Sequence, residues 1–397
     1  MQQKSILICR YQSICEPDVI QGFQKSGYQV EEFTEIMEDI DGDVRYLELL
    51  AEKVKNQTYD FIFSINFFPI ISKLCNAIHL LYVCWVVDCP LITLYSEEIF
   101  GEYNRIFIFD RAMYQYFQRR NPEGIFHLPL AANVAHSDKI CSRISEVEYL
   151  KYQKDITLVG SLYTEKCLYN GIGFLPETLR ECLELAMRKQ MFTQEPDYLE
   201  EALTKERVAE FKEYVHWEDV LEDYKLDDRK FIKEEYLGIK VSEMERIELL
   251  QQLSKQFQVA LFTQSDTAMF SLENVLDCGS AESRIQMPKI FHCSRINLNP
   301  AIKTIQTGIS QRAWDILGAG GFLLSSKQSE LLEYFQMGKD MEWYESLEDL
   351  QNKCEFYLRE ENERVRKEIA GRGYELVKKY HTYDIRISQM LKILKSY

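Results

Sequence analysis

Two apolar runs, Asp60-Phe-Ile-Phe-Ser-Ile65 and Leu81-Tyr-Val-Cys-Trp-Val86, are separated by a helix-like stretch and decide the fold of the first third of the chain. Each run is almost continuously apolar, as expected of a strand whose two faces are both covered by helices. The alternation of such runs with longer helical stretches predicts a parallel sheet with crossover helices, a Rossmann-like domain within residues 1–150. Further strands are expected at Ser5–Cys9, Tyr28–Phe33, Arg105–Phe109 and Ile125–Leu130.

A second Rossmann-like domain is predicted within residues 151–380. It begins with Asp155-Ile-Thr-Leu-Val-Gly-Ser161, which has the form of a strand followed by a small-residue turn. The next clear strand, Gln258–Thr263, is distant, and the helical spacing between them predicts a helical insertion over about 165–256. The remaining elements expected are strands at Lys289–Asn297 and Phe322–Ser325, and helices at Ser310–Leu317, Leu347–Leu358, Glu361–Tyr380 and Tyr383–Leu394.

These elements predict an α/β protein with two Rossmann-like domains that face a shared cleft, where α/β folds bind ligands. Residues 381–397 are expected to form a helix that packs back toward the first domain. The insertion is acidic: residues 195–248 hold 18 acidic and 9 basic side chains, a difference of −9. That charge fits a solvated helical face or, alternatively, a docking surface.

Composition excludes several functional classes. The 397 residues carry a net charge of −16, which opposes binding to nucleic acid or to an anionic membrane surface. No uncharged apolar run is long enough to span a membrane, and the apolar run after Met1 is too short for a signal peptide. The 11 cysteines are scattered without any Cys-x-x-Cys pair, which favours reduced thiols in a cytoplasmic protein.

The stretch from Arg295 to Phe322 combines cations, amides and glycines around a helix start. Ser310 suits the position before the helix, and Arg312 and Asp315 then lie on one face of its first turns. The helix N-terminus, Arg312 and Lys303 could bind a diphosphate, and Asp315 could accept hydrogen bonds from ribose hydroxyls. The alternative is an amphipathic helix with a local Arg312–Asp315 ion pair. The glycines Gly318, Gly320 and Gly321 would then form only a helix end and a turn into a strand.

Other candidate residues follow predicted strands. Gly160 and Ser161 could let backbone N–H groups approach a phosphate, or could form a plain turn. Asp88 ends an apolar strand and is the candidate for acceptor binding or general base, against a capping or turn-forming Asp. Asp110 and His127 are the reserve candidates for the base. A lone His in an apolar run is more often a core residue.

Several motifs resemble one family. Asn297-x-Asn299, Ile305-Gln-x-Gly308-Ile, Arg312-x-x-Asp315, Gly320-Gly-Phe-Leu-Leu324 and the late His381-Thr-Tyr with Arg386 look like the carboxyl-terminal domain of bacterial glycosyltransferases of the spore-maturation type. The amino-terminal half, with Phe63–Pro69, Trp85-Val-Val-Asp-Cys-Pro90, Phe107–Arg111 and Leu128–Ala131, looks like the domain that commonly precedes that module.

This resemblance implies a GT-B fold with a nucleotide-activated sugar bound by the carboxyl-terminal domain. Two departures concern the site: Lys303 stands where Arg is expected, and Thr307 stands where the first carboxylate of a Glu-x₇-Glu pair would fall, with Asp315 as the second. The implied donor-binding residues are Gly160, Ser161, Asn297, Asn299, Lys303, Gln306, Gly308, Arg312, Asp315, Gly320 and Gly321.

The leading hypothesis is a metal-independent, hexosyltransferase-like enzyme that moves a sugar from a nucleoside diphosphate donor, such as a UDP-sugar, to an unknown acceptor. No cofactor and no metal are expected, because cations and helix dipoles can stabilise the leaving diphosphate. The alternatives are a nucleotide-sugar epimerase or hydrolase on the same fold, and a non-catalytic protein that binds sugar nucleotides.

Overall fold

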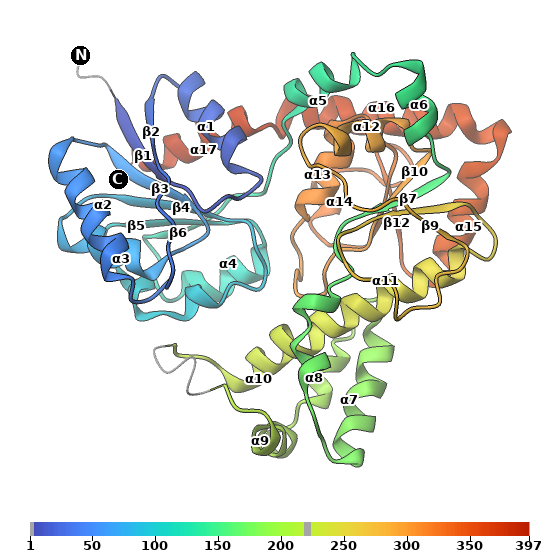
Figure 1. Ribbon diagram of the computed structural model, residues 1–397, viewed down its shortest axis with the longest axis horizontal. Coiled ribbons are helices and arrows are strands. Elements are labelled where there is room, and N and C mark those ends of the chain that lie inside the picture. The colour runs from blue at the N-terminus through green and yellow to red at the C-terminus, as the bar shows by residue number, and fades with distance from the viewer. Residues whose placement is uncertain (1–3, 218–223, 397) are drawn as a thin grey trace. The chain divides into compact units, whose positions relative to one another are not determined.

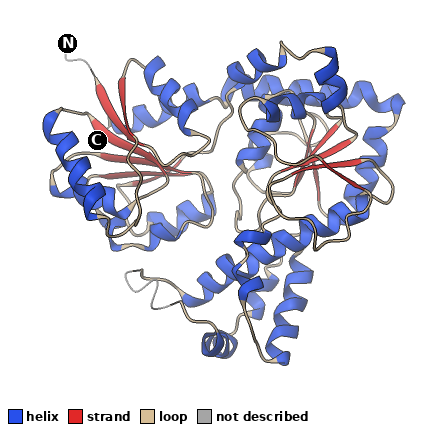
Figure 2. Ribbon diagram, viewed as in Figure 1, coloured by secondary structure: helices blue, strands red, loops and turns tan. Residues whose placement is uncertain are grey.

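The computed structural model describes residues 4–217 and 224–396 (Figure 1). The chain forms two compact units. Of the described residues, unit 1 comprises 4–131, 224–225 and 381–396, and unit 2 comprises 132–217 and 226–380. Each unit contains a six-stranded parallel sheet with helices around it, so the predicted pair of α/β domains is confirmed (Figure 2). In the described part of the chain, no helix combines the length and the apolar character needed to cross a membrane.

The sheet of unit 1 has the strand order β2-β1-β3-β4-β5-β6. Its strands β1, β3 and β4 are buried at every position, because helices cover both faces of the sheet. The strands are β1 (Ser5–Cys9), β2 (Gln29–Phe33), β3 (Phe61–Ile65), β4 (Tyr82–Val86), β5 (Asn104–Ile108) and β6 (Ile125–His127). The helices are α1 (Glu16–Lys25), α2 (Val44–Asn56), α3 (Pro69–Ala77), η1 (Ile92–Tyr95), η2 (Glu97–Phe100), α4 (Arg111–Gln118) and the late α17 (Tyr383–Leu394).

Helix α17 packs against α1 within unit 1. A Cβ atom added to Gly22 of α1 would lie 2.9 Å from Ile387 Cγ1, so the glycine permits the close approach of the two helices. Arg386 of α17 is 3% exposed and donates from Nε to the carbonyl oxygens of Pro129 (2.9 Å) and Leu130 (3.2 Å). The carboxyl-terminal segment is therefore part of the first sheet's unit.

The sheet of unit 2 has the order β12-β11-β10-β7-β8-β9. Its core joins apolar side chains of β7, β8, β10 and β11 with those of α11, α15 and α16. The strands are β7 (Ile156–Val159), β8 (Val259–Phe262), β9 (Val275–Asp277), β10 (Ile296–Asn299), β11 (Leu323–Ser326) and β12 (Glu342–Tyr344). The helices outside the insertion are α5 (Val134–Cys141), α6 (Glu146–Tyr152), α12 (Gln286–Cys293), α13 (Gln311–Gly318), α14 (Leu331–Tyr334), α15 (Leu347–Leu358), η6 (Glu360–Asn362) and α16 (Glu363–Tyr380).

The described residues between β7 and β8 contain helices but no strand of either sheet, as predicted for the insertion (Figure 1). Residues 218–223, which include four of the acidic side chains of this insertion, lie outside the described residues. The helices between β7 and β8 are η3 (Thr164–Lys166), η4 (Leu168–Gly171), α7 (Glu177–Gln190), α8 (Tyr198–Ala202), α9 (Lys205–Tyr214), α10 (Asp228–Phe231), the π-helix η5 (Ile232–Gly238) and α11 (Ile239–Leu253).

The observed elements differ from the predicted ones in three respects. Residues 289–293 belong to helix α12 and not to a strand, because Pro288 lies in the helix's first turn, where its missing N–H is tolerated. Helices α5 and α6 were not among the elements predicted, and both pack against α12. The edge strands β9 and β12, of three residues each, were not predicted.

Candidate functional site

The candidate site lies at the carboxyl ends of β7 and β10, the two central strands of the unit 2 sheet. From β7 the chain continues to β8 and β9 on one side, and from β10 it continues to β11 and β12 on the other. Open α/β sheets bind ligands at such a switch point, outside the carboxyl ends of the strands. Gly160 follows β7 and Pro300 follows β10, so the two loops that begin there border the site.

Arg246 of α11 joins these two loops. Its guanidinium donates from Nη1 to the carbonyl oxygen of Ser161 and from Nη2 to that of Pro300 (2.6 Å). Its Cζ lies 4.4 Å from the ring centroid of Tyr163, a cation–π contact. Gly160 has φ +149°, a conformation that side chains rarely adopt, so a glycine is required where the backbone turns away from β7. Sequence reasoning missed Arg246.

Helix α13 begins on the other side of the switch point. Ser310 precedes it, and its Oγ donates to Asn299 Oδ1 (3.1 Å) instead of capping the helix. Arg312 in the first turn lies 3.3 Å from Asp315 Oδ2, with its Cζ 5.4 Å from the ring centroid of Phe291. The predicted Arg312–Asp315 pair is therefore formed.

Arg246 and Arg312 share one neighbourhood. Burial lowers the pKa of Arg312 below its usual value, and the positive charge of Arg246 lowers it further, whereas Asp315 opposes the change. The Arg312 side chain is 21% exposed, so it remains within reach of a ligand. Two cations that disfavour each other's charge beside a helix N-terminus form a place that an anion would stabilise.

Lys303 is not placed as a phosphate ligand. Its Nζ lies 2.6 Å from Glu245 Oε2, and the two side chains are 3% and 1% exposed. Tyr344 Oη lies 3.3 Å from the other oxygen of the same carboxylate, and burial raises the pKa of Tyr344, which keeps this hydroxyl protonated. The lysine therefore neutralises a buried carboxylate below the loop after β10.

The two predicted asparagines hold strands together. Asn297 Oδ1 accepts from Thr157 Oγ1 (2.9 Å), and its Nδ2 donates to the carbonyl oxygen of Phe291 (3.0 Å). Asn299 Nδ2 donates to Ser325 Oγ (2.9 Å). Both side chains are buried inside the sheet layer, so neither is a ligand contact. The asparagines act indirectly, since Asn299 fixes the residue that precedes α13.

The predicted glycines have mainly packing roles. Gly320 has φ +75°, and a Cβ atom on Gly321 would lie 2.6 Å from the carbonyl oxygen of Phe291. These two residues let the chain turn tightly between the end of α13 and the start of β11. This matches the alternative interpretation of these glycines as a helix end and a turn into a strand. Gly308 is buried in the loop before α13, and Gln306 is exposed in the same loop. The residues gathered at the switch point are therefore Gly160, Ser161, Tyr163, Arg246, Arg312 and Asp315.

Asp88 lies in unit 1, just beyond the end of β4, and is exposed. Its Oδ2 accepts from Asn66 Nδ2 at 2.6 Å, and the same amide group lies 2.7 Å from Tyr11 Oη. Asn66 follows β3 with φ +60°, and its Oδ1 accepts from the backbone N–H of Val87 (2.9 Å). Burial raises the pKa of Tyr11, and the charge of Asp88 adds to this effect. The carboxylate is thus held at a strand end with access to solvent.

Structural partners hold Asp110 and His127, the reserve candidates for the base, and also His381. Asp110 is 1% exposed and caps α4, accepting from the backbone N–H of Met113 at 2.7 Å. A capping role explains this buried carboxylate, so we withdraw it as a base. His127 Nε2 lies 3.1 Å from the carbonyl oxygen of Phe109. His381 accepts a hydrogen bond from Arg386, and burial beside this cation lowers the pKa of His381 to about 4.

The aspartates before α2 have a structural role and do not form a metal site. Asp39 and Asp43 belong to a polar loop, where Asp43 caps α2 by accepting from the backbone N–H of Tyr46 (2.8 Å). Within residues 4–217 and 224–396, no group of three or more His, Cys, Asp or Glu residues is arranged to hold a metal ion.

Comparison with protein families identifies one domain. Residues 246–392 match the family model described as glycosyl transferase-like. The match begins at Arg246 and includes the whole of α13. No curated protein sequence matches the chain.

Solved structures with the same fold include three proteins of low sequence identity. HepE from Anabaena, solved with UDP and glucose, has a TM-score of 0.59 and 9% identity, covering 99% of this chain and 100% of that one. A glycosyltransferase from Rickettsia africae has a TM-score of 0.54 and 11% identity, covering 100% and 99%. Sucrose-phosphate synthase from Thermosynechococcus elongatus has a TM-score of 0.57 and 9% identity, covering 99% and 98%.

These findings confirm the predicted GT-B fold, and the family match confirms a glycosyltransferase domain in the carboxyl-terminal part of the chain. The predicted function, a glycosyltransferase, agrees with both. The more specific resemblance to the spore-maturation type stays a prediction.

Proposed function

We propose that the protein transfers a sugar from a nucleoside diphosphate sugar to an acceptor hydroxyl, and that unit 2 holds the donor's diphosphate at the switch point between β7 and β10. The observation that carries this proposal is that Arg246 joins the two loops that follow β7 and β10, while Arg312 lies in the first turn of α13, the helix that follows the loop after β10. A diphosphate would neutralise both guanidinium groups and accept hydrogen bonds from the N-terminus of α13. Asp315, one turn further along this helix, is our candidate for the ribose hydroxyls.

UDP is the nucleotide to test first, and a hexose is the sugar. HepE, which shares the fold, was solved with UDP, with UDP and glucose, and with UDP-glucose. The chain's own cations can stabilise the leaving diphosphate, so we propose transfer without a metal. The spore-maturation type and a cytoplasmic location belong to the same proposal. None of the 11 cysteines, all within the described residues, forms a disulfide, which supports a reducing compartment.

For the acceptor side we propose Asp88 as the general base. Its exposed carboxylate ends a rigid buried strand, and the Asn66 amide fixes its orientation through a 2.6 Å hydrogen bond. A base at the end of a strand is held accurately, which proton abstraction from a hydroxyl requires. His127, with one ring nitrogen directed at a backbone carbonyl, is the reserve candidate.

Calorimetric titration of the full chain with UDP and with GDP tests donor binding, and turnover of UDP-glucose with and without candidate acceptors then tests transfer. Binding together with acceptor-dependent release of UDP supports the proposal. UDP release that no acceptor accelerates would identify a hydrolase, and sugar isomerisation would identify an epimerase. Binding without turnover would identify a sugar-nucleotide-binding protein, and the absence of binding to any donor nucleotide would contradict the proposal.

A further inference from the structure

A cavity lies in unit 2, beside the loop that precedes α13. Its volume is about 190 Å³. Eight of its twelve lining residues belong to the helical insertion, and the other four are Lys303, Thr304, Gln306 and Thr307. The described lining residues include neither Arg246 nor Arg312, so the cavity is separate from the proposed diphosphate position.

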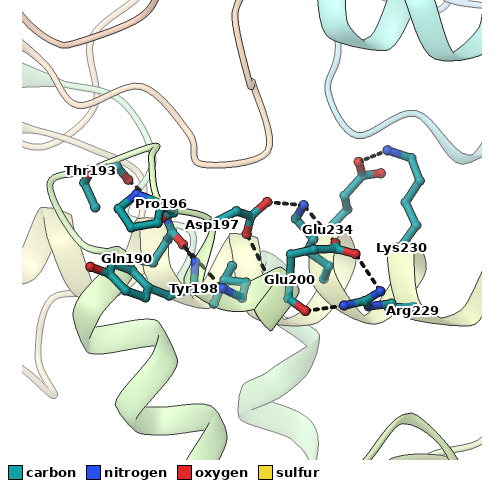
Figure 3. A network of polar contacts seen from close by, with 11 residues as sticks. Gln190, Thr193, Pro196, Asp197, Tyr198, Glu200, Arg229, Lys230 and Glu234 are labelled. Carbon is teal, nitrogen blue, oxygen red and sulfur yellow. Dashed lines mark hydrogen bonds and ion pairs between the residues drawn. The ribbon is translucent and has the colours of Figure 1, made fainter. Parts of the chain in front are cut away.

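The wall from α7 and α8 is fixed by a closed set of hydrogen bonds (Figure 3). The Gln190 side chain is 3% exposed, and its Nε2 donates to the carbonyl oxygens of Thr193 (3.0 Å) and Pro196 (3.3 Å). Its Oε1 accepts from the backbone N–H of Tyr198 at 2.8 Å. Gln194 Nε2 reaches across to the carbonyl oxygen of Ile305 (3.2 Å), which joins this wall to the loop before α13. The cavity is therefore preformed.

The opposite wall comes from the π-helix η5. Lys233 pairs with Asp197 and lies 3.2 Å from Glu200 Oε2, and Lys230 pairs with Glu234 at 2.5 Å (Figure 3). Single π-turns occur frequently at functional sites. Gly238 ends the π-helix, and a Cβ atom on it would lie 2.9 Å from Thr304 Cγ2. The glycine thus allows the π-helix to approach the loop.

The chemistry of the lining selects a ligand class. Three carboxylates line the cavity, from Glu195, Asp197 and Glu234, against two lysines, Lys233 and Lys303, which are both already paired with carboxylates. This balance disfavours an anionic ligand such as a phosphate. Carboxylates, amides and threonine hydroxyls together match hydroxyl groups, each of which both donates and accepts.

We propose that this cavity binds one neutral sugar unit of the acceptor, and that the acceptor is consequently an oligosaccharide or glycoconjugate. The inference rests on the proposed function for its biological role. The volume corresponds to roughly six water molecules, which suits a single sugar ring and not a chain of rings. The donor sugar is attached to the diphosphate at the switch point, whereas most of this cavity's wall comes from the helical insertion. The sugar in the cavity is therefore not the donor sugar. The described lining residues do not include Asp88, the proposed base, so the hydroxyl that reacts belongs to another sugar unit of the acceptor.

The test is saturation-transfer NMR on the full chain, with the methyl glycosides of glucose, galactose, mannose and N-acetylglucosamine as probes. We expect transfer to at least one glycoside, undiminished by saturating UDP-glucose. Glu195 is exposed at the cavity, so Glu195→Gln and Glu195→Trp should fold normally. Glu195→Gln removes the carboxylate and should weaken glycoside binding by about tenfold. Glu195→Trp fills the cavity with an indole and should abolish glycoside binding. Glu181→Gln and Glu181→Trp, at an exposed position of α7 that is absent from the lining, are the matched controls.

Three results would overturn the inference. The first is the absence of a saturation-transfer signal for all four glycosides. The second is displacement of the glycoside by UDP-glucose, and the third is unchanged glycoside binding in a folded Glu195→Trp variant. A failure of the proposed function appears elsewhere, as the absence of nucleotide binding in the calorimetric titration. Glycoside binding without nucleotide binding would therefore leave the cavity assigned and remove only the transferase.

Discussion

Replacing Lys303 with Met distinguishes a structural lysine from a phosphate ligand. Lys303 Nζ lies 2.6 Å from Glu245 Oε2, with side chains that are 3% and 1% exposed. Removing one partner of such a pair leaves a buried, uncompensated charge and commonly costs about 3–5 kcal/mol. The Glu245 carboxylate would retain the 3.3 Å contacts from the Tyr344 hydroxyl and the Phe192 N–H, which are too long to replace the ammonium.

This cost can be measured as a melting temperature. For a domain of the size of unit 2, each kcal/mol lowers the Tm by about 2–4 °C, so Lys303→Met should lower the calorimetric Tm by about 6–20 °C. The double variant Lys303→Met, Glu245→Gln removes both charges and should recover most of this loss, because replacing a whole buried pair is often nearly neutral. UDP titration well below the Tm should give an affinity close to that of the parent.

The opposite result would refute this reasoning. If Lys303→Met melted within about 2 °C of the parent while UDP affinity fell by tenfold or more, the lysine would be a diphosphate ligand. The absence of recovery in the double variant would show that the cost arises from packing and not from the unpaired carboxylate.

Four further predictions concern pH and the two proposed sites. Burial, together with the charge of Glu234, raises the pKa of Glu235 to about 7, so the folded protein loses stability relative to the unfolded chain as pH rises from about 4.5 to 7. Thermal unfolding should therefore show that Glu235→Gln is more stable than the parent at about pH 8, by at most about 3 kcal/mol, and no more stable at about pH 4. Because the pKa of His381 is lowered to about 4, the unfolded state takes up a proton first as pH falls below about 6.5, and this destabilises the folded protein. The His381→Gln variant should therefore lose less stability than the parent between about pH 7.5 and 5. Equal losses in the two proteins would contradict this assignment. In calorimetric titration, Asp315→Asn should weaken the binding of UDP more than the binding of 2′-deoxy-UDP. An equal effect on both affinities would contradict the assignment of Asp315 to the ribose hydroxyls. Asp88→Asn should lower transfer by about 10²–10⁴ with UDP affinity and Tm nearly unchanged, whereas an active but less stable variant would make Asp88 a turn residue.

Much of the fold could be predicted because strands buried on both faces give apolar runs of distinctive length. Helix α17 was predicted with its observed bounds, and β1 was too. The edge strands β9 and β12 escaped prediction because three residues are too few to show a period. The run at 289–293 resembled a strand, since its apolar residues also suit one face of a short helix whose first turn contains Pro288.

The site was less predictable, because its chemistry depends on partners distant in sequence. Lys303 suggested a phosphate ligand until the fold brought Glu245 to it from α11. Arg246 was missed for the same reason: it is one cation in a helix rich in charges, and no local spacing marks its contacts with Ser161 and Pro300. Arg312 and Asp315 could be predicted, since their spacing on one helix is sufficient to pair them.

The most direct test of the donor site is calorimetric titration of UDP into the parent, Arg312→Ala and Arg364→Ala. Arg364 lies on α16 with a side chain that is 85% exposed, which makes it a matched control for the loss of one guanidinium. We predict that Arg312→Ala loses about 1.5–3 kcal/mol of binding free energy, the value of a charge-assisted hydrogen bond, while Arg364→Ala binds as the parent does. A folded Arg312→Ala variant that binds UDP as tightly as the parent would contradict the account.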